Sequence, residues 1–412
     1  MKVIPAVHQR ILMTTGARKV IKFYLVINCG SSSLKFSLYD SAALAQVWSG
    51  SISPIGTGTG QMLIKTNEGK ILESRRAKFQ DLDLAVQEVI KWLENKRDSY
   101  PLKAIGHRLV QGGPNHRQPE FVTPVLLKTL RQFVYLAPNH LPDELMAIKA
   151  FGAVFCQVPQ VVCFDTAFHR DIPSVAKYYP LPEKYKKKGL MKYGFHGLSY
   201  QYILQELLNE DQLASKKKII IAHLGNGASM AAVNNGSSVD TTMGISPIGG
   251  LVMGTRSGDL DPGALLFILK QDHLTVDQLD DLLSKKSGLK AIAGKSGVQE
   301  LLEAEQTDLK AKEALRVFCY SAKKYIGSLS AAMGGLDMLV FTGGIGEHSS
   351  IIRERICAEL EFMGIDLDKP KNTMHKNPLS KKNSRVAVLV IPTNEELMIA
   401  RLVGHLLSNK KK

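Results

Sequence analysis

The chain has 412 residues, more than the roughly 250–300 at which a single hydrophobic core stops growing, so two domains are expected. Hydrophobic residues make up 44% and charged residues 22%, a composition that excludes a fibrous or low-complexity protein. The formal net charge is +15, but the lysines form short scattered runs without an RNA-recognition signature or interleaved aromatic residues. We therefore expect a solvated basic surface and no nucleic-acid partner.

Five scattered cysteines without a C-x-x-C pair predict a reducing, cytoplasmic location and no structural zinc. No apolar run approaches the ~20 residues of a membrane-spanning helix, so no membrane partner is expected. The first acidic residue is Asp40, and residues 1–22 read as a basic N-terminal extension, or as an upstream start with Met13 as the true one. They lack the Ser richness and amphipathic spacing of a targeting segment.

The first predicted element is a β-hairpin that begins at Phe23. A β-rich run leads to the turn Gly30–Ser33, after which Leu34, Phe36 and Leu38 alternate with polar residues, as in a half-buried strand. Apolar residues at helical spacing predict a helix over Leu82–Lys96, and the run Val161–Phe164 predicts a buried strand.

The hairpin pattern returns about 195 residues later, over Ile219–Gly236, and two copies indicate two related domains. Leu336–Ile356 follows as an apolar strand, a glycine turn (Gly343, Gly344, Gly346) and a helix with Ser349 and Ser350 near its start. The tail from Arg385 predicts a buried strand and a closing helix that could return to the first domain. Strands alternating with helices give an α/β class.

Turns of small residues between strands expose backbone N–H groups that can surround phosphate oxygens. Asn28 and Lys35 bracket the first turn, offering a carbonyl oxygen for a metal and an ammonium group for phosphate. His223, Asn226 and Ser229 surround the glycines of the second turn. Either turn alone would more often be a plain hairpin, but two together favour a phosphate site.

Arg108 and Arg256 are expected in glycine-flanked loops, where a guanidinium group suits a carboxylate or a phosphoryl oxygen. The alternative is that each arginine braces its loop through ion pairs. Asp165 follows a buried strand, a favourable position in an α/β crevice. His196 could donate to a transferring group, although a histidine beside aromatic residues is more often packed in a core.

Taken together, these segments resemble the acetate and propionate kinases of the acetokinase family over roughly Phe23 to Leu406. The matching segments are VINCGSSSLKFSLYD, GHRLVQGG, FDTAFHRDIP, YGFHGLSY, AHLGNGASMAAV, NGSSVDTTMG, MGTRSGDLDPG, FTGGIGEHS and IPTNEELMIAR. The resemblance implies a duplicated actin/hexokinase-like (ribonuclease H-like) fold with the active site in the interdomain cleft. We expect a first domain over 23–168 plus 397–412 and a second over 169–396.

The resemblance also implies roles for individual residues. Asn28 and Glu395 would contact Mg²⁺, for which Mn²⁺ could substitute, and Arg108 would hold the acyl carboxylate. Asp165 would be the catalytic carboxylate, while His196 and Arg256 would stabilise the transferring phosphoryl group. The nucleotide and its phosphates would be bound by Lys35, His223, Leu224, Gly225, Asn226, Gly227, Gly344, Ile345, Gly346, Glu347 and His348.

Two departures from the family pattern bear on specificity. The usual L-A-P-L-H-N-P reads Leu136–Pro142 (LAPNHLP), which alters the surroundings of the acyl methyl group. After Val298, the Asp, the aromatic residue or Met, and the Arg that commonly contact adenosine in the family are replaced by Gln299–Leu302, in a segment about four residues shorter. Base recognition is therefore in question, whereas the phosphate and acyl segments are retained.

The sequence thus predicts a Mg²⁺-dependent homodimeric kinase that interconverts acetate and ATP with acetyl phosphate and ADP. Alternatives are propionate or another short carboxylate as acceptor, and another nucleotide or pyrophosphate as donor. A non-catalytic nucleotide sensor would keep the glycine turns without needing Arg108 or Asp165.

Overall fold

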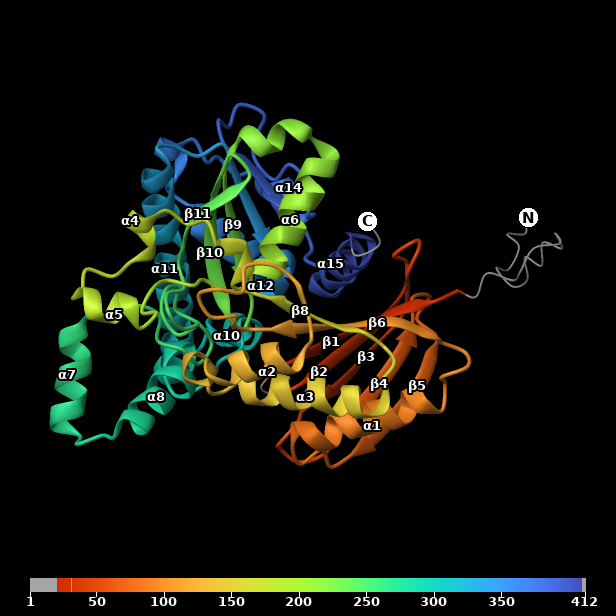
Figure 1. Cartoon of the computed structure of the whole chain (residues 1–412). Helices are drawn as coiled ribbons and strands as arrows, with labels where there is room; N and C mark the ends of the chain where they lie inside the picture. The colour runs from red at the N-terminus through yellow and green to blue at the C-terminus, as the bar shows by residue number, and fades with distance from the viewer. Residues whose placement is uncertain (1–20, 31, 410–412) are drawn as a thin grey trace, which may run out of the picture.

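We describe the protein from a computed structural model over residues 21–30 and 32–409. Most of the predicted extension 1–22, the turn residue Ser31 and the predicted domain end 410–412 lie outside these ranges. Two β-sheets with helices on their faces form the described part (Figure 1).

The first sheet has the strand order β5-β4-β3-β2-β1-β6-β8-β7. Its strands are β1 (Phe23–Cys29), β2 (Leu34–Asp40), β3 (Gln46–Ser53), β4 (Gly60–Thr66), β5 (Ile71–Ala77), β6 (Leu102–Leu109), β7 (Glu120–Phe121) and β8 (Gln160–Phe164). The second sheet has the order β11-β10-β9-β12-β13. Its strands are β9 (Lys218–Leu224), β10 (Ala228–Asn234), β11 (Ser237–Thr241), β12 (Met338–Thr342) and β13 (Ala387–Val390).

The α-helices connect and cover these strands. They are α1 (Leu82–Glu94), α2 (Pro124–Arg131), α3 (Leu141–Val154), α4 (Ser174–Lys177), α5 (Glu183–Lys187), α6 (Gly197–Glu210), α7 (Pro262–Gln271), α8 (Val276–Lys285), α9 (Gly288–Ala293), α10 (Val298–Ala304), α11 (Leu309–Met333), α12 (Gly343–His348), α13 (Ser350–Cys357), α14 (Lys369–Thr373) and α15 (Glu395–Asn409). Short 3₁₀ turns are η1 (Val134–Leu136), η2 (Ala167–His169), η3 (Gln212–Lys216) and η4 (Glu361–Met363).

The two sheets share one topology. In the first, the hairpin β1-β2 extends antiparallel to β3, while β6 and β8 add in parallel on the other side of β1. In the second, the hairpin β9-β10 extends antiparallel to β11, while β12 and β13 add in parallel beside β9. The predicted duplication of an actin/hexokinase-like domain is therefore confirmed, and the repeated hairpin is its first unit.

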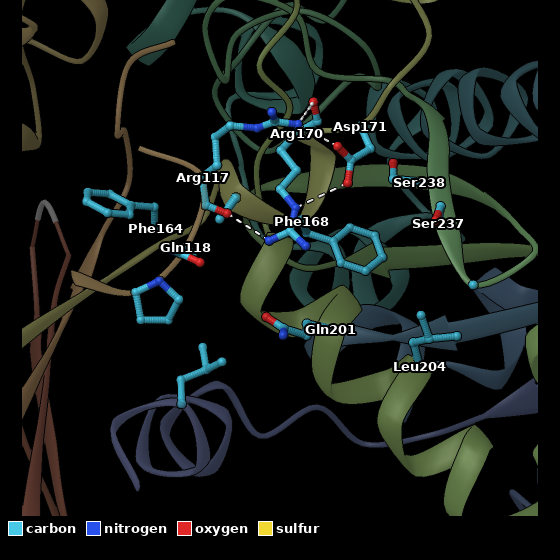
Figure 2. Close-up of a pocket in the computed structure, with 14 residues that line it drawn as sticks. Arg117, Gln118, Phe164, Phe168, Arg170, Asp171, Gln201, Leu204, Ser237 and Ser238 are labelled. Carbon is cyan, nitrogen blue, oxygen red and sulfur yellow. Dashed lines mark hydrogen bonds and ion pairs between the residues drawn. The ribbon is translucent and has the colours of Figure 1, made fainter. Parts of the chain in front are cut away.

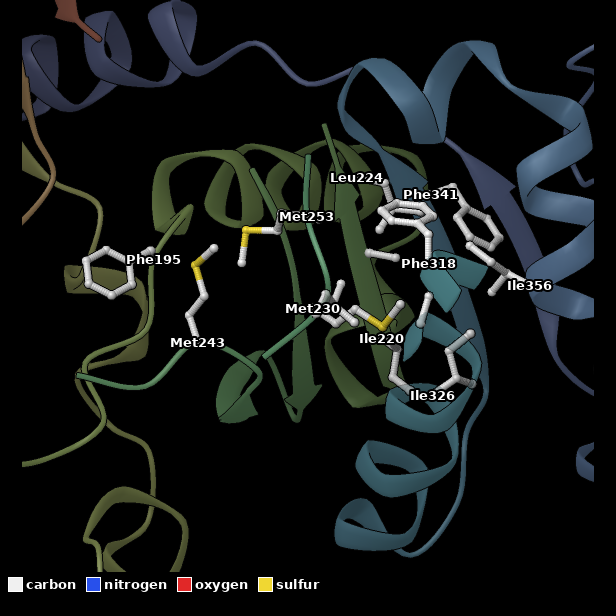
Figure 3. Packing of buried hydrophobic residues seen from close by; sticks show 14 of the residues in the cluster. Phe195, Ile220, Leu224, Met230, Met243, Met253, Phe318, Ile326, Phe341 and Ile356 are labelled. Carbon is white, nitrogen blue, oxygen red and sulfur yellow. The ribbon is translucent and has the colours of Figure 1, made fainter. Parts of the chain in front are cut away.

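Alternating residues of each central strand face different helices, because successive side chains of a strand point to opposite faces. On β1, Leu25 and Ile27 join the cluster with α1 and α3, whereas Tyr24 and Val26 join the cluster with α15. On the second sheet, Ile220 and Phe341 pack toward α11, as Figure 3 shows. Each domain is thus a sheet between helical layers.

The closing helix α15 packs on β1 and β6 of the first sheet, as expected from the tail of the sequence. It also contacts α6, which covers the second sheet, so the chain crosses between the sheets after β8 and again before α15. The domain boundaries at 168/169 and 396/397 remain predictions.

Two local expectations were wrong. Arg108 lies in strand β6 and not in a loop, because the residues Leu102–Leu109 pair in parallel with β1 and β8. A helix does begin at Ser350, as expected, but the glycines between β12 and that helix are not a turn. They form the short helix α12 themselves, and Ser349 caps the following helix α13 by accepting a hydrogen bond from the Ile352 N–H.

Candidate active site

The predicted site residues gather where the central strands end. Asn28 and Arg108 lie near the carboxyl ends of the parallel strands β1 and β6, and Asp165 directly follows β8. In the second sheet, His223 lies at the end of β9. Ligand sites of open α/β sheets form at this edge, which explains why residues far apart in sequence meet.

Arg108 is the centre of a polar cluster. Its Nε donates to Asp165 Oδ2 at 3.0 Å, and its Nη1 donates to Asn28 Oδ1 at 3.2 Å. Glu395, the first residue of α15, places Oε2 3.9 Å from Arg108 Nε. Burial disfavours the charge on the guanidinium group, but Asp165 and Glu395 outweigh this effect and raise the pKa of Arg108. The arginine is therefore a fixed cation.

Asp165 is fully buried, and its second oxygen is free. Among the described residues, Asp165 Oδ1 has no hydrogen-bond partner. The backbone of the same residue is pinned, since Asp165 O accepts a hydrogen bond from the Gly197 N–H at 2.9 Å. A Cβ at Gly197 would lie 2.0 Å from that oxygen, so only glycine allows this approach. The contact fixes Asp165 next to His196.

His196 precedes α6 in a left-handed conformation, with φ at 58°. Its Nδ1 lies 2.8 Å from Ser229 Oγ, and its ring stacks on that of His223 with centroids 4.3 Å apart. Burial, the neighbouring His223 and the Arg108 charge together lower the pKa of His196 well below its usual value. The imidazole is therefore neutral at physiological pH.

Arg256 lies in the loop between β11 and α7, as predicted, and its Nη1 donates to Pro247 O at 3.1 Å. Burial, followed by the charge of Arg108, lowers the pKa of Arg256. A Cβ at Gly227 would lie 3.4 Å from both Arg256 Nη1 and His196 Nε2. The two donors therefore converge on the glycine turn between β9 and β10.

The predicted nucleotide segments lie side by side. The Gly225–Gly227 turn is closed by a hydrogen bond from the Gly225 N–H to Gly227 O at 3.1 Å. Gly343, which begins α12, has a φ of 76° and approaches Leu224 so closely that a Cβ there would lie 2.8 Å from Leu224 O. Gly344 and His348 are exposed on α12, while Gly346 is buried.

The side chain of Glu347 ties these segments to the start of α15. Its Oε1 accepts hydrogen bonds from the Gly343 N–H at 2.8 Å and from the Thr393 N–H at 3.0 Å. Thr393 Oγ1 in turn donates to Ser199 Oγ at 2.8 Å, and Ser199 Oγ lies 2.9 Å from His223 Nδ1. The carboxylate of Glu347 is thus engaged by the protein itself.

Lys35 lies beside this cluster and not inside it. It pairs with Asn28 across the first hairpin, and its side chain lines a neighbouring cavity of about 400 Å³. Thr393 and Asn394 line the same cavity. Lys35 is nevertheless near enough to contribute, after burial and Arg108, to lowering the pKa of His223 to about 4.

Sequence reasoning missed several residues that hold the site together. Ser199 and Thr393 lie inside the matching segments, and Ser229 was expected beside the second turn, but nothing in their spacing indicated contacts with the two histidines. Glu144, buried on α3, accepts from the Val110 N–H with both carboxylate oxygens, at 3.1 and 3.0 Å. Burial raises the pKa of Glu144 to about 8. An acidic residue that follows Asp143 in the first turn of an apolar helix gave no such signal.

The expected magnesium contacts, Asn28 and Glu395, both lie at Arg108. Among the described residues, no three His, Cys, Asp or Glu side chains are grouped to hold a metal ion. Mg²⁺ is usually held by one or two carboxylates together with substrate phosphates. The free Asp165 Oδ1, with the oxygens of Asn28 and Glu395 nearby, is a donor set of that kind. These residues therefore fit the ion.

Comparison with known proteins agrees with this arrangement. The model of the acetokinase family matches residues 23–401. Acetate kinase of Carboxydothermus hydrogenoformans is 41% identical over 398 residues, which cover 94% of this chain and 99% of that protein.

Two solved structures are similar as well. The structure of Porphyromonas gingivalis acetate kinase has a TM-score of 0.84 and 36% identity, covering 94% of this chain and 100% of that one. A propionate kinase from Francisella tularensis has a TM-score of 0.87 and 35% identity, covering 93% and 99%. The chain described here therefore belongs to the acetokinase family.

Proposed function

We propose that the protein is an acetate kinase, which transfers the γ-phosphoryl group of ATP reversibly to acetate and gives acetyl phosphate and ADP. Family membership supports this proposal. The observation that carries it is the pairing of Arg108 with Asp165 close to Arg256 and His196. Two guanidinium groups beside one free carboxylate oxygen suit two anionic substrates that must approach each other.

In the proposed reaction, Arg108 holds the acetate carboxylate, and Asp165 orients the Arg108 guanidinium group by accepting its hydrogen bond with Oδ2. A carboxylate oxygen of acetate attacks the γ-phosphorus in line, and the bond between that phosphorus and the bridging oxygen of ADP breaks. Both substrates arrive negatively charged, so no proton has to leave the attacking oxygen. The protein's contribution is therefore positioning and charge compensation.

Arg256 and His196 stabilise the transferring group from the opposite domain. The Tyr200 hydroxyl group hydrogen-bonds to Ser229 Oγ, and burial raises the pKa of Tyr200, so the phenol stays protonated. We infer that Tyr200 donates to Ser229, which donates to His196 Nδ1. The His196 proton then lies on Nε2, the atom beside Gly227 and Arg256, where it can donate to a phosphoryl oxygen.

The nucleotide is proposed to bind along the Gly225–Gly227 turn and α12, with its phosphates toward Lys35 and Arg256. When bound, Mg²⁺ at Asn28 and Glu395 would neutralise phosphate charge, and Mn²⁺ could replace it. In place of the family's adenosine contacts, Leu301 is buried in the core, while the Gln299 amide donates to Glu303 at 3.2 Å within α10. Discrimination between bases is therefore proposed to be weak.

Propionate remains a second candidate acceptor, because a propionate kinase structure matches this chain as well as an acetate kinase structure does. One methylene group changes discrimination by only about 1–3 kcal/mol. The altered segment Leu136–Pro142 places His140 near Arg108 and Arg256, since burial followed by these two charges lowers the pKa of His140 to about 4. A sensor without catalysis has no need of the Arg108–Asp165 pair.

A homodimer is proposed from helix α7, which Figure 1 shows projecting with α8 from the second domain. None of the residues of α7 is buried, and the large apolar side chains of Leu266 and Phe267 are 56% and 65% exposed. Such an apolar surface on an arm is typical of a protein interface. The cysteines are all free, in keeping with the proposed cytoplasmic location, and no described helix is long and apolar enough to cross a bilayer.

The test is a hydroxamate assay of acyl phosphate formation with acetate, propionate and butyrate as acceptors and ATP, GTP and pyrophosphate as donors. Acetate with ATP and Mg²⁺ should give the highest kcat/KM. A higher kcat/KM with propionate would show that propionate is the preferred acceptor. Activity with pyrophosphate and none with a nucleotide would show that pyrophosphate is the donor. No acyl phosphate with any pair would contradict the kinase proposal.

A further inference from the structure

A second cavity, of about 200 Å³, is lined by residues other than those of the proposed reacting centre, and Figure 2 shows this lining. Its polar lining includes Arg117, Gln118, Arg170 and Gln201, and its apolar lining includes Phe168 and Leu402. None of these residues belongs to the site described above. The cavity therefore needs an explanation of its own.

The cavity lies where the chain passes between the two sheets. Gln118 comes from the β6–β7 connection of the first sheet, and Gln201 comes from α6 on the second sheet. Arg170 belongs to the first crossing, just after β8, and Leu402 belongs to α15, the second crossing. A molecule bound here would contact both domains and both connections at once.

The polar end of the cavity carries excess positive charge. Arg117 and Arg170 share the carboxylate of Asp171, which is the only acidic residue in the described lining. The Lys177 ammonium group is close by, donating to Arg170 O at 3.2 Å. Three cations thus face one carboxylate.

Several donors of this cavity are not used by the protein. Arg170 donates from Nη1 to Arg117 O and from Nε to Asp171, which leaves its Nη2 without a partner among the described residues. The side-chain amides of Gln118 and Gln201 make no hydrogen bond within the same ranges of the chain. In Figure 2, the Arg170 guanidinium group points into the space on the side of these two amides.

The cavity is connected to the reacting centre by a short path. Ser238, in its lining, hydrogen-bonds to His169 Nδ1 at 2.8 Å, and His169 Nε2 donates to Phe195 O at 3.1 Å. Phe195 precedes His196 in the chain. Phe168, also in the lining, is three residues from Asp165. A ligand in this cavity would therefore contact or adjoin the chain segments that carry Asp165 and His196.

We propose that this cavity is a regulatory site for a short organic acid with two carboxylate groups, bound between the two domains. One carboxylate pairs with Arg170 and accepts from the Gln118 and Gln201 amides. The second faces Arg117, because Arg117 and Arg170 share the single carboxylate of Asp171, and the carbon chain packs against Phe168 and Leu402. A ligand held by both domains stabilises the arrangement in which its contacts are made. The effect on turnover rests on the proposed kinase function, whereas binding does not.

The experiment is calorimetric titration of the full-length protein with malonate, with inorganic phosphate as a second arm. Arg108→Ala serves as the background, because it removes the anion contact of the reacting centre. Gln201→Glu adds a negative charge to the cavity without breaking a hydrogen bond, and Gln132→Glu adds the same charge on an exposed surface of the first domain as a control.

Malonate should bind to the Arg108→Ala protein, and Gln132→Glu in that background should leave the affinity unchanged. Gln201→Glu in the same background should weaken malonate binding at least tenfold. Hydrogen exchange in the wild type should show malonate protection at residues 166–171 and 236–238, a readout that does not depend on the folding of any variant. Equal binding to Gln201→Glu, or protection confined to the reacting centre, would overturn the proposal. If phosphate bound as tightly as malonate, the packing proposed for Phe168 and Leu402 would not contribute to binding, and that part of the proposal would be wrong.

Discussion

Arg108 and Asp165 are 57 residues apart in the chain, and the Arg108 Nε donates to Asp165 Oδ2 at 3.0 Å between adjacent parallel strands. This pair fixes one carboxylate oxygen and leaves the other free in a buried position. A cation and an oriented carboxylate are thereby held together where the acceptor is proposed to bind.

Asp165→Asn and Arg256→Ala should each nearly abolish turnover without unfolding the protein. Loss of an arginine that stabilises the transferred group lowers the rate by about 10³–10⁵ in related phosphoryl transfers. The measurement is kcat at saturating substrates, with circular dichroism to show that each variant is folded. If a variant kept more than about a tenth of wild-type turnover, its residue would not act at the reacting centre.

Arg108→Ala should raise the KM for acetate well above any change in the KM for ATP, because Arg108 is proposed to hold the acyl carboxylate. Asp165 and Glu395 lose their shared cation in this variant, so kcat should fall as well. Steady-state kinetics with each substrate varied in turn provide the test. Equal changes in both KM values would show that Arg108 has a structural role and does not hold the acyl carboxylate.

Ser229→Ala should lower kcat by about tenfold while leaving the KM for ATP within about twofold, because the lost hydrogen bond orients His196 and contributes about 0.5–1.5 kcal/mol. Ser229→Thr keeps the hydroxyl group and should restore part of the loss. Ser380→Ala, which removes a buried hydroxyl group that accepts from the Val388 N–H, is the matched control outside the reacting centre. An unchanged kcat in Ser229→Ala would remove Ser229 from the proposed mechanism.

ATP, GTP and ITP should all serve as donors, within about tenfold of one another, because losing one or two hydrogen bonds to the base removes about 0.5–1.5 kcal/mol each. The described α10 offers no guanidinium group in place of the missing arginine, since Gln299 is engaged with Glu303 and Leu301 is buried. A donor comparison at fixed Mg²⁺ and acetate checks this. A hundredfold preference for ATP would show that other residues recognise adenine.

His107→Gln should make the free energy of unfolding less sensitive to acid. Burial lowers the pKa of His107 from 6.5 to about 4, so the unfolded chain binds its proton first as the pH falls. Above pH 6.5 the His107 ring is neutral in both the folded and the unfolded chain, so its protonation does not change the free energy of unfolding. As the pH falls from 6.5 to 4, the unfolded chain is protonated first, and the free energy of unfolding decreases progressively. At pH 5 this one group should account for roughly 2 kcal/mol.

Urea unfolding of wild type and His107→Gln at pH 7.5 and 5.0 measures this difference directly. Glu144 acts in the opposite sense, because its pKa is raised and its folded form binds a proton below about 8, but its effect is common to both proteins and cancels. If the difference between the two proteins were the same at both pH values, His107 would not be buried in its neutral form.

The sequence by itself determined the α/β class, the duplicated hairpin and the segments that carry the proposed chemistry. These features are local: period-two alternation on Leu34–Leu38 and small residues in the turns are written in consecutive positions. The family resemblance added residue roles in the same way, segment by segment.

Only the tertiary structure decided which residues of these segments touch. Arg108 lies in a strand because β6 fills the position between β1 and β8, a pairing that depends on partners far along the chain. The hydrogen bonds of His196 to Ser229, of Ser199 to His223 and of Glu347 to Thr393 depend on how two sheets and α15 pack. The cavity beside Arg170 likewise exists only between both crossings of the chain, because no single segment contains more than a fraction of its lining.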